Sequence, residues 1–434
     1  MTLRVFAILF ALFTGAGAWA QTVAVVGGTV HTLGPDGTIE NATVLIENGV
    51  VTRLGQDVVV PPGAAIIDAA GKVVTPGLFT PYGILGLVEV GFSAGPIDAV
   101  QRGDGFTAAF DVADAYNPRS TLVAVNRIEG ITRALIAPQA RGPDPVAGSS
   151  HVLSGLAAVV NLGTGDDYLD RRSAALVVNL GEAGSGLAGG TRTGTLLTLE
   201  QALEQASDFR QNAAAFARNQ HPGYDFSVPD LEALGTVLSG DVPMLVHVHR
   251  ASDIEAVMRL AERFSLRVIL IGAAEAWMLA DALAAAGIPV ILEPTDNLPS
   301  NFDQLNARRE AAQILADAGV SIAFAGSQST THNARNITQS AGNAVAEGLD
   351  YETALRAMTL VPAQMFGVAD RLGSLETGKV ADLVVWPGDP LELRNYPEQV
   401  LIGGVAVPMQ SRQTLLRDRY LQNDTERPPA FRRP

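Results

Sequence analysis

The chain has 434 residues, enough for one large barrel and a second, smaller module. Its apolar content of 47% indicates a substantial core, and its formal net charge of −15 argues against nucleic acids and anionic membranes as partners. The absence of cysteine excludes disulfides and thiolate metal sites.

Residues 1–20 have the pattern of a cleaved export signal. Arg4 supplies a positive charge, residues 5–13 form an apolar run, and Ala18-Trp19-Ala20 has the small-x-small spacing of a cleavage site. The apolar run is short for a membrane span, which needs about 20 residues. We therefore expect cleavage before Gln21, export to a periplasm, and no membrane association of the mature chain.

Both ends of the mature chain predict β-structure. Residues 22–75 contain short β-branched runs separated by Gly and Pro turns, and residues 370–422 return to the same character. We expect the two ends to pair as one composite β-sandwich domain. Residues 423–434 are polar and rich in Pro and Arg, so we expect them to form a flexible tail.

Between these ends, residues 76–369 alternate short apolar strands with amphipathic helices. This pattern predicts a parallel sheet, either closed as a TIM-type barrel or open and doubly wound. The clearest strands are expected at 243–248, 267–271, 289–292 and 321–325, with helices at 251–264, 275–286 and 302–318 between them. Two segments depart from the repeat, a hairpin around 142–170 and a long helix around 199–219, and we interpret both as insertions over the active face.

Three stretches together resemble the amidohydrolase superfamily, in particular its imidazolonepropionase-like branch. They are Gly27-Gly28-Thr29-Val30 through Pro76-Gly77-Leu78, the segment 246–251, and residues 332–384, which include Leu372-Gly373-Ser374-Leu375-Glu376. The resemblance implies an α/β fold, with a TIM-type (β/α)8 barrel plus a small discontinuous β-sandwich domain. It also implies metal-dependent hydrolysis of non-peptide C–N bonds in amides or cyclic amides.

The resemblance further implies a set of metal ligands, which can be compared with this chain. The family has His-x-His after the first barrel strand, often a carboxylated Lys after the fourth, one His each after the fifth and sixth, and an Asp after the eighth. Only His247, on the fifth strand, is a retained ligand, and His249 lies beside it. The other positions fall at Tyr82, Ile84, Val177, Gly272 and Gln328.

These replacements predict a degenerate metal centre, as in a pseudoenzyme. A single imidazole cannot hold a catalytic divalent ion, because such sites use about three protein ligands. Gln328, in place of the Asp, can form hydrogen bonds but cannot accept a proton at neutral pH. The candidate pocket then consists of Tyr82, His247, His249, Gln328 and His332.

Three functions fit this pattern. The first is an exported non-catalytic paralogue, without a cofactor, that binds a small-molecule ligand or pairs with a second copy or a homologous amidohydrolase subunit. The second is an active hydrolase with an unusual centre around His247, His249 and His332, which would use a divalent metal such as zinc. The third is a structural subunit of a larger envelope assembly.

Overall fold

The computed structural model describes residues 22–89, 95, 97–101, 105–140, 151–295, 298–326 and 331–421. The predicted export signal, Gln328 and the predicted tail at 423–434 lie outside the described residues.

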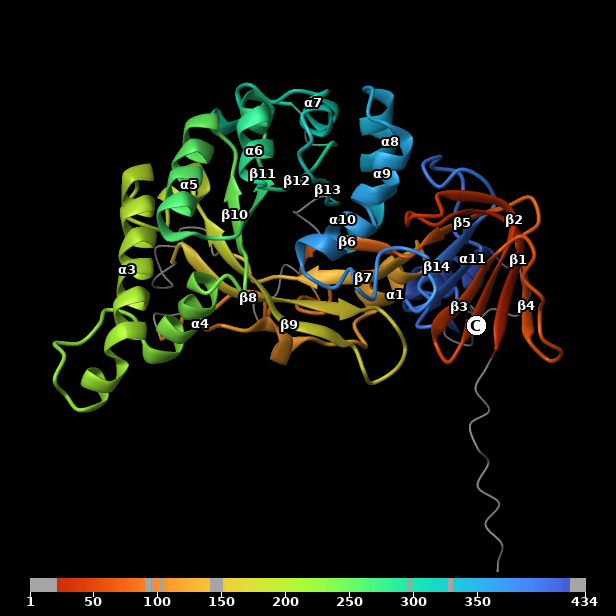
Figure 1. Ribbon diagram of the computed structural model, residues 1–434, viewed down its shortest axis with the longest axis horizontal. Coiled ribbons are helices and arrows are strands. Elements are labelled where there is room, and N and C mark those ends of the chain that lie inside the picture. Colours follow the sequence, from red (N-terminus) through yellow and green to blue (C-terminus); the bar gives the residue numbers. More distant parts are fainter. Residues whose placement is uncertain are drawn as a thin grey trace, which may run out of the picture.

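Strands from both chain ends form one eight-stranded sheet, at the right of Figure 1. The connection between the ends is made by β5, which pairs in parallel with β1 and antiparallel with β14, where Thr75 lies opposite Val384. The composite β-domain predicted from sequence is therefore confirmed. Its strands are β1 (Val23–His31), β2 (Thr38–Glu47), β3 (Val50–Gly55), β4 (Ala65–Asp68), β5 (Val73–Pro76), β14 (Leu383–Trp386), β15 (Gln399–Ile402) and β16 (Val405–Ala406).

The second sheet follows chain order from β6 to β13 and curves into a nearly closed barrel, because its two edge strands approach each other. The predicted TIM-like barrel is thereby confirmed. Its strands are β6 (Leu78–Gly83), β7 (Ile131–Ile136), β8 (Leu153–Asn161), β9 (Leu169–Asn179), β10 (Met244–Val248), β11 (Val268–Gly272), β12 (Val290–Leu292) and β13 (Ile322–Phe324).

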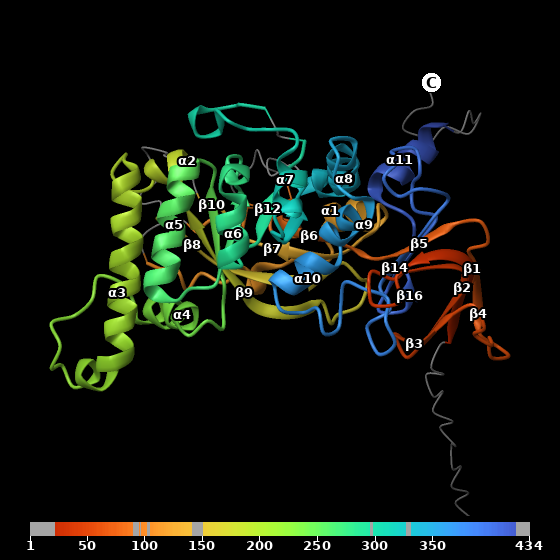
Figure 2. The same cartoon turned by 45° about the horizontal axis from the view of Figure 1, so that its top comes forward.

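Helices connect most of these strands and cover the outside of the barrel, as Figure 2 shows. The α-helices are α1 (Thr121–Arg127), α2 (Gly181–Ser185), α3 (Arg192–Ala217), α4 (Val228–Leu238), α5 (Ala251–Phe264), α6 (Ala280–Ala286), α7 (Ala311–Asp317), α8 (Ile337–Ala346), α9 (Tyr351–Ala357), α10 (Leu360–Met365) and α11 (Arg412–Leu421). Short 3-10 helices are η1 (Val112–Ala115), η2 (Ala276–Leu279), η3 (Phe302–Gln304) and η4 (Thr331–Asn336). None of the described helices is long and apolar enough to cross a membrane.

The segment interpreted as a hairpin insertion has a different place in the fold. Its first strand, β8, pairs antiparallel with β7 on one side and with β9 on the other, so it is the third strand of the barrel itself. An insertion lying over the barrel would leave β7 and β9 to pair directly, whereas here β8 separates them. Periodicity alone could not distinguish the two cases, because both contain a hairpin.

The predicted helices also differ in detail from the observed ones. The long helix α3 begins at Arg192, seven residues before the expected start, because the hydroxyl of Thr191 accepts a hydrogen bond from the Gly194 amide and caps it. The expected helix 302–318 is divided into η3 and α7, and 275–286 into η2 and α6. The exposed helix α11 has no buried residue, and its sequence did not predict it.

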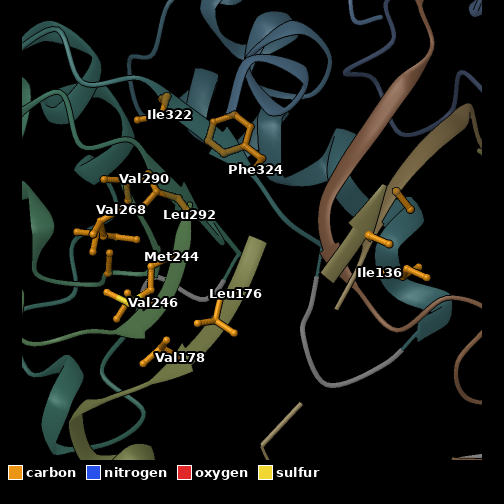
Figure 3. Packing of buried hydrophobic residues seen from close by; sticks show 14 of the residues in the cluster. Ile136, Leu176, Val178, Met244, Val246, Val268, Val290, Leu292, Ile322 and Phe324 are labelled. Atoms are coloured by element: carbon orange, nitrogen blue, oxygen red, sulfur yellow. The ribbon is translucent and has the colours of Figure 1, made fainter. Parts of the chain in front are cut away.

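The barrel strands have a period of two. Alternate residues point outward and pack against the helices, among them Val246, Val268 and Val290 in Figure 3. The residues between them, such as Leu245, Ile269 and Ile291, form a second cluster that fills the barrel interior. This alternation decides which side chains at the carboxyl ends of the strands face the centre.

A buried ion triad joins the barrel to the β-domain. Arg133 on β7 lies 3.1 Å from Asp170 on β9 and 3.1 Å from Asp382, which immediately precedes β14. Burial raises the pKa of both carboxyls, and the positive charge of Arg133 opposes that shift. The Arg133 guanidinium therefore lies between two desolvated carboxyl groups and contacts both of them.

Replacing Arg133 with Met should destabilise the protein by about 3–5 kcal/mol, because two buried carboxylates lose their counter-charge. Urea denaturation would measure this loss. The matched control is Arg172→Met, which breaks exposed ion pairs with Asp111 and Asp114 and should cost less than about 1 kcal/mol. Equal losses in the two variants would contradict the importance of the buried triad.

Candidate functional site

Two predicted site residues meet inside the barrel. Tyr82 lies at the end of β6 and His247 on β10, and their rings pack edge to face with centroids 4.8 Å apart. Such a contact is favourable because the positive ring edge meets the negative face. An aromatic pair thus occupies the place where the family resemblance implies the first ligands of a metal.

The imidazole of His247 is held in its neutral form. Its Nε2 is buried and has no hydrogen-bond partner among the described residues. Burial lowers the pKa of His247 from its ordinary 6.5 to about 3, and nearby His249 adds to the effect. Protonation would place an unpaired charge in a largely apolar interior, which explains the direction of this shift.

Glu293 also belongs to this site, although the sequence motifs did not reveal it. It directly follows β12, two residues after Ile291, whose side chain lies in the barrel interior. The same period of two directs Glu293 inward. Burial raises the pKa of the Tyr82 hydroxyl, and the negative charge of Glu293 raises it further, so Tyr82 remains protonated. Extending the alternation of inward and outward side chains by one residue beyond the end of β12 would have identified Glu293 as an inward-facing carboxylate.

His249 occupies the space in front of Gly272. A Cβ atom added to Gly272 would lie 2.5 Å from Cε1 of the His249 ring, and the backbone there has φ +82°. His249 Nδ1 is also 3.3 Å from Nε2 of Gln304 in η3. A larger side chain at Gly272, such as the histidine expected from the resemblance, therefore could not coexist with this position of His249.

The strand register corrects two of the predicted ligand positions. His247 pairs with Asn179 on β9 and with Ile271 on β11, so these residues share its level in the barrel. Val177 lies one layer lower, beside Leu245, and Gly272 is level with Val248. Asn179 donates a hydrogen bond of 2.7 Å to the Ser154 hydroxyl. Neither corrected position carries a Lys or His.

The remaining candidates do not complete a metal centre. Ile84 packs against the outer core, and His332 is exposed in η4. Across the described residues, no three His, Asp or Glu side chains are arranged to hold a metal ion. Tyr82, Asn179 and Ile271, which surround His247 or share its level, do not fit the divalent metal implied by the resemblance.

The family model for the amidohydrolase family matches residues 188–409, which span β10 to β13 and much of the β-domain's second half. The chain belongs to the amidohydrolase family. A crystal structure of an amidohydrolase from Thermotoga maritima MSB8 is similar over 89% of this chain and 100% of its own, with a TM-score of 0.78 and 25% identity. Molinate hydrolase, with a TM-score of 0.53 and 19% identity over 90% of this chain and 95% of its own, shares the fold.

One curated relative is longer than this amidohydrolase-family chain. Amidohydrolase tasK of Hapsidospora irregularis is 25% identical over 396 residues, which cover 84% of this chain and 39% of the relative. The chain thus spans about two fifths of that relative's length. These similarities establish the family and do not separate its imidazolonepropionase-like branch from the others.

The lowered pKa of His247 makes a prediction about acid stability. Between roughly pH 4 and 6.5 the unfolded chain binds a proton at this residue and the folded chain does not, so stability should fall as the pH falls. His247→Phe removes that proton and keeps an aromatic ring against Tyr82. The variant's free energy of unfolding should depend less steeply on pH, by up to about 1.4 kcal/mol per pH unit. Equal slopes, measured by urea denaturation at several pH values, would argue against a neutral His247.

Proposed function

We propose that this protein is a non-catalytic member of the amidohydrolase family, whose barrel binds a small molecule and does not hydrolyse it. The observation that carries the proposal is the packed pair of Tyr82 and His247, two positions at which the resemblance implies metal ligands. Hydrolysis in the family needs a metal to lower the pKa of a bound water and polarise the carbonyl. Tyr82, Asn179 and Ile271 supply none of the ligands for such an ion.

The remaining polar groups are suited to binding. Protonated Tyr82 can donate a hydrogen bond, neutral His247 has a buried Nε2 without a partner among the described residues, and Glu293 brings a negative charge to the same end of the barrel. Together they favour a small ligand with a carbonyl acceptor and a donor or cationic group. The proposal of an active hydrolase around His247, His249 and His332 has less support, because His332 is exposed in η4.

Metal binding provides the decisive test. Mature protein purified from zinc-supplemented cells should contain far less than one equivalent of divalent metal by mass spectrometry. Added Zn²⁺ should leave its melting temperature unchanged, because a ligand that binds only the folded state would raise it. A stoichiometric metal, or hydrolysis of a panel of amides and cyclic amides that is lost on chelation, would refute the proposal.

We also propose that the protein is exported to a periplasm and acts there, on the basis of the leader-like residues 1–20. Amino-terminal sequencing of protein recovered from the cell envelope fraction should then begin at Gln21. Replacing Ala18 and Ala20 with Arg should block processing, because the cleavage site needs small residues at these positions. Recovery of an intact chain beginning at Met1 from the cytoplasm would contradict export.

A further inference from the structure

A pocket of about 230 Å³ lies between α1 and the turn that joins β8 to β9. Helix α1 and the residues before it contribute Arg119, Ser120 and Arg127 to its lining, and the turn contributes residues 163–166. Because β8 runs antiparallel to β7 and ends beside the start of β7, this turn lies at the end of the barrel opposite the aromatic pair of the candidate site. Figure 1 shows α1 on the side of the barrel next to the β-domain. The pocket is therefore separate from the barrel centre.

Arg127, in the last turn of α1, is a buried cation without a carboxylate partner. The residue is only 9% exposed. Its Nη1 donates hydrogen bonds to the carbonyl oxygens of Leu162 at 3.0 Å and Gly163 at 3.5 Å, and its Nε is buried without a partner among the described residues. No carboxylate in the described part of the chain forms an ion pair with it, in contrast to Arg133. Burial lowers the pKa of Arg127, because its desolvated positive charge is left uncompensated.

Further hydrogen-bond donors surround the same pocket. Arg119 is exposed, and its guanidinium forms no ion pair within the described residues. In the turn, the backbone amides of Thr164 and Gly165 donate no hydrogen bond to any described residue, and a Cβ atom added to Gly165 would meet nothing within 4 Å beyond its chain neighbours. The Ser120 hydroxyl is already used, because it donates to Glu89 at 2.9 Å. Two arginines and open backbone amides are the donors that proteins use to bind oxyanions.

Asp166 also lines the pocket and determines which oxyanion fits it. It is exposed and forms no ion pair with Arg119 or Arg127. An ionised carboxylate only accepts hydrogen bonds, so it repels an anion whose oxygens all lack protons. Inorganic phosphate keeps at least one protonated oxygen at neutral pH and can donate a hydrogen bond to Asp166, whereas sulfate has no proton to donate. This carboxylate therefore favours phosphate over sulfate.

We propose that the pocket between α1 and the β8–β9 turn is a binding site for inorganic phosphate. Arg119 and Arg127 compensate the charge of the ion, the turn amides bind its unprotonated oxygens, and Asp166 accepts its proton. The pocket is smaller than the roughly 300–1,000 Å³ of sites for drug-sized ligands, which suits a small ion. The site lies away from Tyr82 and His247, so this proposal does not depend on the absence of a catalytic metal.

Isothermal titration calorimetry and thermal unfolding of the purified protein would measure this binding, in phosphate-free buffer with the ionic strength held constant by sodium chloride. Phosphate should bind with a stoichiometry near one and raise the melting temperature, because a ligand of the folded state stabilises it. It should bind at least about 10-fold more tightly than sulfate, and Asp166→Asn should reduce this preference to less than about 3-fold, because an amide can donate to either ion.

Substitutions of the two arginines test the cationic side of the pocket. Arg119→Met removes a guanidinium that is not needed for the fold, so it should weaken phosphate binding about 10-fold and leave the melting temperature of the phosphate-free protein unchanged. Arg127→Met should abolish binding, with folding checked by circular dichroism. If that variant does not fold, Arg119→Met decides alone. The matched control Arg53→Met, at an exposed arginine of β3, should bind phosphate like the wild type.

Three results would overturn the proposal. The first is a wild-type protein that phosphate neither binds nor stabilises at up to roughly 10 mM. The second is equal affinity for phosphate and sulfate, which would contradict the role of Asp166. The third is an Arg119→Met variant that binds phosphate as tightly as the wild type, or an Arg53→Met control that loses as much affinity, because either would place the binding elsewhere.

Discussion

The two-residue period of the barrel strands is the constraint on which the rest of this structure depends. It divides every strand into side chains that pack against the helices and side chains that fill the barrel. Because parallel neighbours are aligned in register, one strand position sets the level of several others. His247 thus has Asn179 and Ile271 beside it, and continuing the alternation beyond Ile291 brings Glu293 into the same interior.

The barrel interior contains several of the positions at which this chain lacks the metal ligands that the family resemblance implies. Tyr82 and His247 are in direct contact, and His249 uses the space that a side chain at Gly272 would need. A histidine restored at Ile271, the position level with His247, would add one ligand and leave the other ligand positions without one.

The fold places polar side chains in unusual positions at two distant points, with different consequences. At the contact between the barrel and the β-domain, the positive charge of Arg133 faces two buried carboxyl groups, Asp170 and Asp382. All three members of this ion network belong to the same chain. In the connection between β12 and α7, Asp303 accepts a hydrogen bond from Arg192 and Glu275 accepts one from Asn306, while Phe302 is exposed. Buried polar groups are there satisfied inside the molecule, while the apolar side chain next to them faces outward.

The sequence by itself determined the elements whose signals are local. The strand and helix periods, the turn residues between them and the ordered family motifs predicted the barrel, the β-domain formed by both chain ends, and His247 with His249 at the end of one strand. The tertiary structure decided what depends on pairing between distant segments. Only strand register shows that β8 belongs to the barrel and that Asn179 and Ile271, not Val177 and Gly272, are level with His247. Likewise, the neutral state of His247 and the outward position of Phe302 follow from burial and from hydrogen bonds between residues far apart in the chain, which no local pattern of residues encodes.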